Sequence, residues 1–179
     1  MRSLRSTTRL LGPLFLATLF VSCEDHSQAV TDPAVTPQFT LGSGSTSTLL
    51  GRATFEGDDR TFKVKRMTGS WHVEVKSKPA LDLAVQTIVF QAGGHSGWHS
   101  HPGPVFIQVV SGTMTFYESD DPTCTPIVRT AGQSFLDVGD HAHIARNETE
   151  APAQNLVAYL APPGAALRID QPNPGNCPF

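Results

Sequence analysis

The chain has few charged residues and no segment of the kind that binds nucleic acid. Only 16% of its 179 residues are charged, the net charge is -3, and no basic block follows the N-terminal residues. We therefore predict no nucleic-acid partner. The sequence also lacks a long amphipathic helical pattern, an internal repeat and a Gly-x-Ser-x-Gly motif. These absences argue against a helical bundle, a repeat protein and a serine hydrolase.

The longest apolar run is too short to span a bilayer comfortably. It extends from Leu10 to Val21 and follows Arg2, Arg5 and Arg9. A positive segment before a short apolar run is typical of a secretory signal peptide, which we predict over residues 1–22.

Cys23 ends the sequence Phe20-Val21-Ser22-Cys23. This sequence resembles a bacterial lipobox, in which the cysteine becomes lipidated, although Phe20 stands where Leu is usual. We predict an extracytoplasmic lipoprotein in the periplasm or at the cell surface, anchored to the membrane by its lipid alone. The alternative is an ordinary cleaved signal peptide and a chance cysteine.

Cysteine is scarce, with only three residues in the chain. If Cys23 carries lipid, Cys124 and Cys177 remain, and export places them in an oxidising compartment. We predict a disulfide between these two, which would pin the C-terminal tail to a loop. Two unpaired thiols are the alternative.

The composition divides the chain into a linker, a domain and a tail. Residues 23–48 are poor in large apolar side chains and rich in Ser, Thr, Pro and Gly, which predicts a disordered, flexible linker. Short alternating runs begin near Leu49 and predict one β domain over residues 49–170. The Pro-rich segment 171–179 is predicted to be an irregular tail.

Several short runs of β-branched and aromatic residues predict strands, which indicates an all-β sandwich or barrel. A Ser-Gly pair at 111–112 separates two of them and predicts a hairpin. The predicted strands are 61–65, 71–75, 85–90, 105–110, 113–117, 133–138 and 156–160.

The histidines are the most informative residues. His99 and His101 are two positions apart, so on a strand both side chains point to one face. A third histidine from another strand could complete a set of neutral imidazoles, which suits Zn, Cu, Fe, Ni and, less strongly, Mn.

The glycines and histidines of this region resemble the first motif of the cupin family. That motif reads Gly, five residues, His-x-His, three or four residues, Glu, six residues, Gly. Here Gly93, His99, His101 and Gly112 have the matching spacing. The position of the Glu is occupied by Val105, so the usual carboxylate ligand is absent there.

The second cupin motif, Gly, five residues, Pro-x-Gly-x-x-His, three residues, Asn, follows in order. Gly132, His143 and Asn147 match it, whereas Val138 and Asp140 replace its Pro and Gly. The resemblance covers roughly residues 80–162.

The resemblance implies a single cupin double-stranded β-helix, a jelly-roll-type barrel. It also implies that His99, His101 and His143 are metal ligands for a divalent ion (Fe, Mn, Ni, Cu or Zn). Three neutral ligands leave the charge of the ion uncompensated, which favours a small anionic ligand or substrate.

Two further histidines are additional candidates. His141 is two residues before His143, so on a regular strand both side chains point to the same face. It is an alternative fourth ligand, or else a residue of the barrel rim. His95 lies in the Gly-rich loop and could cap the metal or act as an acid or base, or simply be solvated. We assign no catalytic residue, although Asp140, Glu118 and His95 are candidate acids or bases.

The family resemblance does not decide between enzyme and binding protein, because cupin barrels serve both roles. One hypothesis is a metal-dependent enzyme, dioxygenase-like or isomerase-like, acting on a small molecule. The alternatives are a metal-free protein that binds or senses a small ligand, and a structural barrel. Pairing of sheet edges would allow a homodimer.

Overall fold

A computed structural model describes residues 39–56, 61–65, 72–76 and 80–179, with backbone alone at 61–65 and 72–76. The predicted signal peptide, the lipidation site Cys23 and most of the predicted linker lie outside these residues. Within the described ranges, no helix has the length and apolarity needed to cross a membrane.

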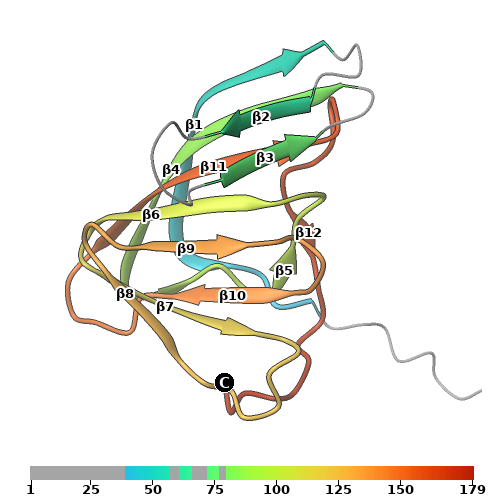
Figure 1. The fold of residues 1–179 in the computed structure, drawn as a ribbon. Helices are drawn as coiled ribbons and strands as arrows, with labels where there is room; N and C mark the ends of the chain where they lie inside the picture. The colour runs from blue at the N-terminus through green and yellow to red at the C-terminus, as the bar shows by residue number, and fades with distance from the viewer. Residues whose placement is uncertain (1–38, 57–60, 66–71, 77–79) are drawn as a thin grey trace, which may run out of the picture. The chain divides into compact units, whose positions relative to one another are not determined.

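Ten strands form one antiparallel sheet in which β4 joins two groups of strands (Figure 1). β4 pairs along most of its length with β1 and β11, and it reaches β10 only through the pair His95–Arg146. The first group consists of β1 (Ser43–Phe55), β4 (Leu81–His95), β11 (Ala153–Ala161), β6 (Val105–Ser111) and β9 (Ser134–Asp137).

The second group is shorter and carries most of the loops. It consists of β12 (Ile169–Asp170), β5 (His99–Ser100), β10 (His143–Arg146), β7 (Thr113–Glu118) and β8 (Ile127–Thr130). A separate hairpin pairs β2 (Thr61–Lys65) with β3 (His72–Lys76). The all-β barrel predicted from the sequence is therefore confirmed.

The core lies between the two groups because strand residues alternate between an inner and an outer face. In β11, every second residue from Ala153 to Ala161 is buried. Phe116 of β7 stacks on Phe135 of β9 with ring centroids 4.3 Å apart, so this pair joins the groups across the core.

The predicted hairpin at Ser111-Gly112 is wrong. β6 pairs with β11 and β9, whereas β7 pairs with β10 and β8, so the two strands belong to different groups. Gly112 has a φ of 75° and lies against Ala153, where an added Cβ would come within 2.8 Å of the alanine Cβ. The glycine therefore turns the chain from one group to the other instead of closing a hairpin.

The predicted linker boundary is also wrong, because residues 43–48 belong to β1. Ser43 pairs with His95, and the pairing continues to Phe55 opposite Leu81. All residues of β1 are exposed. Main-chain pairing with β4 needs no apolar side chains, which explains why a polar segment can form this strand.

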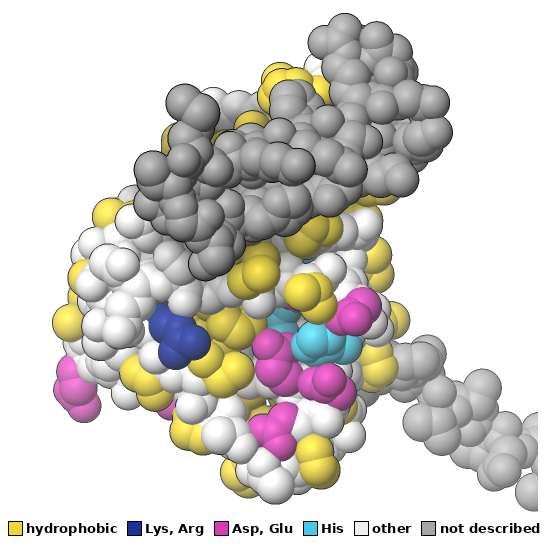
Figure 2. All heavy atoms as spheres, viewed as in Figure 1, with side chains coloured by type: hydrophobic (Ala, Val, Ile, Leu, Met, Phe, Trp, Pro, Cys, Tyr) yellow, Lys and Arg dark blue, Asp and Glu magenta, His cyan; other side chains and the backbone are white. Residues whose placement is uncertain are grey.

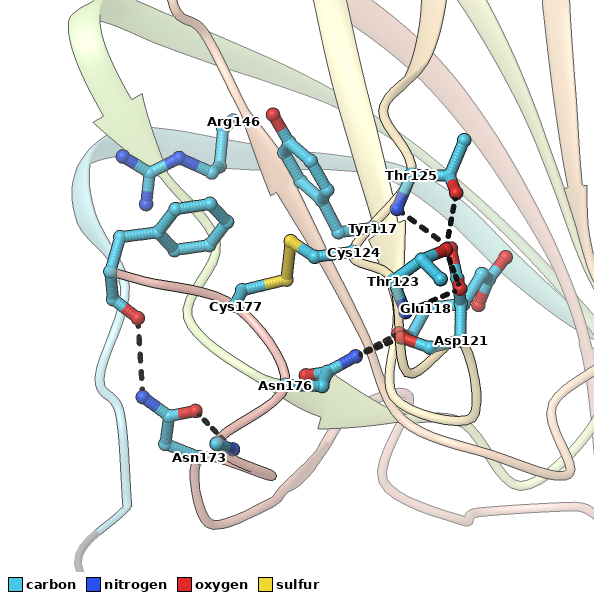
Figure 3. Close-up of a disulfide and its surroundings, with 12 residues drawn as sticks. Tyr117, Glu118, Asp121, Thr123, Cys124, Thr125, Arg146, Asn173, Asn176 and Cys177 are labelled. Carbon is cyan, nitrogen blue, oxygen red and sulfur yellow. Dashed lines mark hydrogen bonds between the residues drawn. A yellow bond between two sulfur atoms is a disulfide. The ribbon is translucent and has the colours of Figure 1, made fainter.

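A disulfide joins Cys124 to Cys177, the pair predicted from the sequence, with 5.2 Å between the Cα atoms (Figure 3). Next to it, the Asn176 side-chain amide donates hydrogen bonds to the main-chain oxygens of Glu118 and Asp121, at 2.8 and 2.7 Å. The tail beyond β12 is irregular, as predicted, yet these contacts attach it to the loop after β7.

Candidate metal centre

Three histidines from the second group of strands meet inside the barrel. His99 on β5 pairs with His143 on β10, and His101 follows β5. The side chains are buried, with only 7%, 5% and 1% of His99, His101 and His143 exposed. One nitrogen from each ring lies within 4.8 Å of the others. The structure thus brings together the three histidines that the motif spacing predicts.

Hydrogen bonds to the main chain fix two of the rings. The His99 Nδ1 lies 2.9 Å from the Gly97 carbonyl oxygen, and the His101 Nδ1 lies 2.6 Å from the Leu167 carbonyl oxygen. A carbonyl oxygen only accepts hydrogen bonds, so each Nδ1 must carry the proton. Each Nε2 therefore keeps a free lone pair, as a metal-binding imidazole requires.

Burial keeps these imidazoles neutral. It lowers the pKa of His99 well below 6.5, and the neighbouring His143, Arg168 and His101 lower it further. Burial and then His143 lower the pKa of His101 to about 4. Near pH 7 both rings are in the form that binds a cation.

A buried carboxylate lies next to the three histidines. The Asp137 Oδ2 is 2.8 Å from the His143 Nδ1 and 3.6 Å from the His101 Nε2. The first distance is that of a close polar contact, and neither atom has another hydrogen-bond partner. Burial raises the pKa of Asp137, but the His143 contact, the Gly139 N–H and His101 outweigh burial, and the pKa is lowered.

A cavity of about 430 Å³ opens beside His99 and His101. Its polar lining includes Tyr159 and Gln86, and the Gln86 side-chain amide donates a hydrogen bond to the Tyr159 hydroxyl. Burial raises the pKa of Tyr159 to about 12. The phenol therefore stays protonated and can donate its own hydrogen to a molecule in the cavity.

Arg168 gives the cavity a positive charge. Its Nε donates to the Asp170 carboxylate at 2.6 Å, whereas its Nη2 is buried without a partner. No carboxylate is among the described residues that line the cavity, which are Gly42, Ser45, Ser47, Gln86, Ile88, Phe90, Ser96, His99, His101, Tyr159, Ala166, Leu167 and Arg168. An anion would match this lining.

His141 does not join the three-histidine group. Its Nδ1 and Nε2 lie 2.6 Å from carboxylate oxygens of Asp140 and Glu118, respectively, and Asp120 is nearby. Burial lowers the pKa of His141, but the bonds to these carboxylates outweigh burial and raise it. His141 instead belongs to a separate group with Glu118 and Asp120, whose nearest nitrogen and oxygen atoms lie within 4.8 Å of one another. Figure 2 shows histidine and acidic side chains together on one face.

His95 also lies outside the three-histidine group. It is half-buried, and its Nδ1 accepts a hydrogen bond of 3.2 Å from the Gly97 N–H. Trp98, which strand parity turns away from the metal side, is fully buried and packs with Tyr117 and Ile144. Neither residue is among those that line the cavity beside His99.

Sequence reasoning missed four polar residues of this region: Gln86, Asp137, Tyr159 and Arg168. Alternation could have indicated two of them, because Asp137 shares parity with Phe135, and Tyr159 with Val157. Arg168 approaches the cavity through an irregular segment, for which the sequence gives no comparable signal.

The fold and the histidine group define a small β-barrel protein with a candidate three-histidine metal centre. Residues 86–159 match the model of the cupin domain family. This part of the chain is therefore similar to cupin domains. A search of curated proteins found no match.

The chain is similar to several solved structures. A cupin domain from Bordetella pertussis has 14% identity and a TM-score of 0.43, covering 66% of this chain and 95% of that one. A double-stranded β-helix protein from Klebsiella pneumoniae has 19% identity and a TM-score of 0.42, covering 50% and 75%. The DMSP lyase DddQ from Ruegeria pomeroyi has 20% identity and a TM-score of 0.42, covering 49% and 42%.

Proposed function

We propose that the protein holds a divalent metal ion with His99, His101 and His143 and that it binds, or acts on, a small anionic molecule outside the cytoplasm. The observation that carries this proposal is the fixed orientation of the imidazoles. Main-chain carbonyls hold the Nδ1–H groups of His99 and His101, which leaves each Nε2 free to bind a cation.

The donor set fits a metal ion. The imidazoles are buried, and one nitrogen from each ring lies within 4.8 Å of the others. Neutral imidazoles at this spacing match the donor set of a transition-metal ion. When bound, a divalent ion supplies Lewis acidity that polarises an oxygen of its ligand.

The cavity supports an anionic partner. Arg168 offers a buried N–H group to a carboxylate or oxyanion, and Tyr159 offers a hydroxyl donor. We expect oxalate or phosphate to raise the melting temperature of the metal-loaded protein, and Arg168→Gln to reduce that increase. Equal stabilisation of both proteins would exclude Arg168 from anion recognition.

The extracytoplasmic location rests on the N-terminal segment and on the Cys124–Cys177 disulfide, a bond typical of oxidising compartments. Labelling of cells with a radioactive fatty acid tests the anchor. We expect label on the wild-type protein and none on Cys23→Ser. Label on both proteins, or on neither, would overturn lipidation at this residue.

Metal content tests the centre. We expect close to one equivalent of a transition metal in the purified protein, lost in His99→Ala/His101→Ala and kept in His141→Ala, whose histidine lies outside the group. A wild-type protein that binds none of the five candidate metals would overturn the proposal. It would favour a barrel that binds its ligand without metal.

A further inference from the structure

We propose that Asp137, on β9, is a fourth protein ligand of the metal. It would replace the Glu of the first cupin motif, whose position on β6 is occupied by Val105. This inference rests on the proposed three-histidine centre and extends its ligand set from three nitrogens to three nitrogens and an oxygen. Three features of the site support it: the register of β6 and β9, the contacts of the carboxylate and the charge of the ligand set.

The register places Asp137 directly opposite Val105. These residues are Cα partners in the antiparallel pair of β6 and β9. Opposite residues in such a pair point to the same face, with Cβ atoms about 4.5–5.5 Å apart. Val105 and Asp137 are both buried, at 1% and 2% exposure. A carboxylate lost from one strand is therefore present at the neighbouring position on the next strand.

The two carboxylate oxygens of Asp137 have different surroundings. Oδ1 accepts a hydrogen bond of 2.7 Å from the Gly139 N–H, which holds the side chain in place. Oδ2 faces two of the three imidazoles and has no partner outside them. A cation held by those imidazoles would give this buried, charged oxygen a further favourable contact.

A role limited to orienting His143 accounts less well for this arrangement. A carboxylate that orients a metal-bound histidine normally accepts a hydrogen bond from the ring N–H. Here the Asp137 Oδ2 lies 2.8 Å from the His143 Nδ1 but also 3.6 Å from the His101 Nε2, a lone-pair nitrogen for which orientation of His143 gives no reason. As a ligand, Asp137 would also offset one of the two positive charges that three neutral imidazoles leave on the ion.

The test measures the affinity and the visible absorption spectrum of bound Co²⁺, with a chromophoric chelator as competitor. Asp137→Asn keeps the size of the side chain and removes its charge. Asp140→Asn is the matched control, because Asp140 is exposed and contacts only His141 among the described histidines. We expect Asp137→Asn to weaken Co²⁺ binding at least about 100-fold, beyond the 10–100-fold typical of outer-shell residues, and to change the spectrum.

A carboxylate swap separates coordination from orientation of His143. Asp137→Val removes the ligand, and Val105→Glu in the same chain returns a carboxylate to the opposite strand. We expect the double variant to bind Co²⁺ more tightly than Asp137→Val alone and to regain a spectrum like that of the wild type. Circular dichroism checks that each variant folds. If Asp137→Asn or Asp137→Val does not fold, Asp137→Ser takes its place.

The outcomes distinguish this inference from the proposed function. Wild-type affinity and spectrum in Asp137→Asn would overturn the role of Asp137 and leave the three-histidine centre intact. Weaker binding with an unchanged spectrum and no rescue by the swap would also overturn coordination and leave only orientation. No Co²⁺ binding by the wild-type protein would overturn both proposals.

Discussion

Asp82 and Asp137 are equally buried, at 2% exposure each, but their partners differ. Asp82 accepts three hydrogen bonds, from Arg52 Nε at 2.6 Å, Thr54 Oγ1 at 2.6 Å and Gly164 N at 3.0 Å. Asp137 accepts one, from the Gly139 N–H, and its other oxygen faces only the histidine group.

The difference distinguishes a structural carboxylate from a candidate ligand. Asp82 links β1, β4 and the loop after β11, and both of its oxygens are used. A fully paired buried carboxylate stabilises the fold and has little capacity left for a ligand. Asp137 keeps one oxygen beside two imidazoles, without a partner elsewhere in the fold. Burial of a carboxylate alone therefore does not identify a ligand site, whereas the absence of structural partners does.

The largest expected effect on stability follows loss of the paired carboxylate. Asp82→Ala leaves Arg52, Thr54 and the Gly164 N–H without their acceptor, so we expect the melting temperature to fall by about 5–10 °C. Thermal unfolding of the metal-free protein measures this. Co²⁺ affinity should change far less than in Asp137→Asn, and an equal loss in both variants would remove the distinction between the two residues.

Metal binding should stabilise the protein strongly only when Asp137 is present. At a metal concentration 100 times the wild-type Kd, we expect unfolding to cost about 2.7 kcal/mol more than without metal. A 100-fold weaker site at the same concentration would gain only about 0.4 kcal/mol. Denaturant titrations with and without metal compare Asp137→Asn with Asp140→Asn, which should keep the full increase.

Without metal, substitution of Asp137 should destabilise the protein less than substitution of Asp82. Asp137→Asn removes the negative charge, and the new amide oxygen can still accept from the Gly139 N–H. We expect the free energy of unfolding to change by less than about 1 kcal/mol. Urea unfolding of the metal-free protein measures it, and a large loss would show that Asp137 is structural like Asp82.

Sequence patterns predicted the fold and the three histidines because both depend on local spacing. The alternation at 61–65 and 113–117 located β2 and β7 to within a residue, and the motif spacing selected His99, His101 and His143. β10 is only four residues long, and β1 is too polar to show a strand pattern. β1 forms because β4 offers main-chain partners, and β10 forms because β7 does, which composition does not show.

The partners of the histidines were harder to predict because they depend on register between distant strands. Asp137 becomes a candidate only once β9 is aligned with β6, which brings residue 137 opposite residue 105. Arg168 reaches the cavity from the loop between β11 and β12. The N-terminal anchor and the extracytoplasmic location remain predictions from the sequence.

A further expected effect is an acid-dependent loss of stability that Asp82 contributes and Asp82→Asn lacks. Hydrogen bonds from Thr54, Gly164 and Arg52 lower the pKa of Asp82 from 3.8 to about 2 in the folded protein. Because the folded pKa lies below the unfolded value, this stabilisation is complete above about pH 4 and is lost as the pH falls toward 2. The urea midpoints of wild-type protein and Asp82→Asn should therefore differ near pH 6 and converge between pH 4 and 2. A constant difference across that range would show that the paired carboxylate stabilises the fold through its shape and hydrogen bonds, independently of its charge.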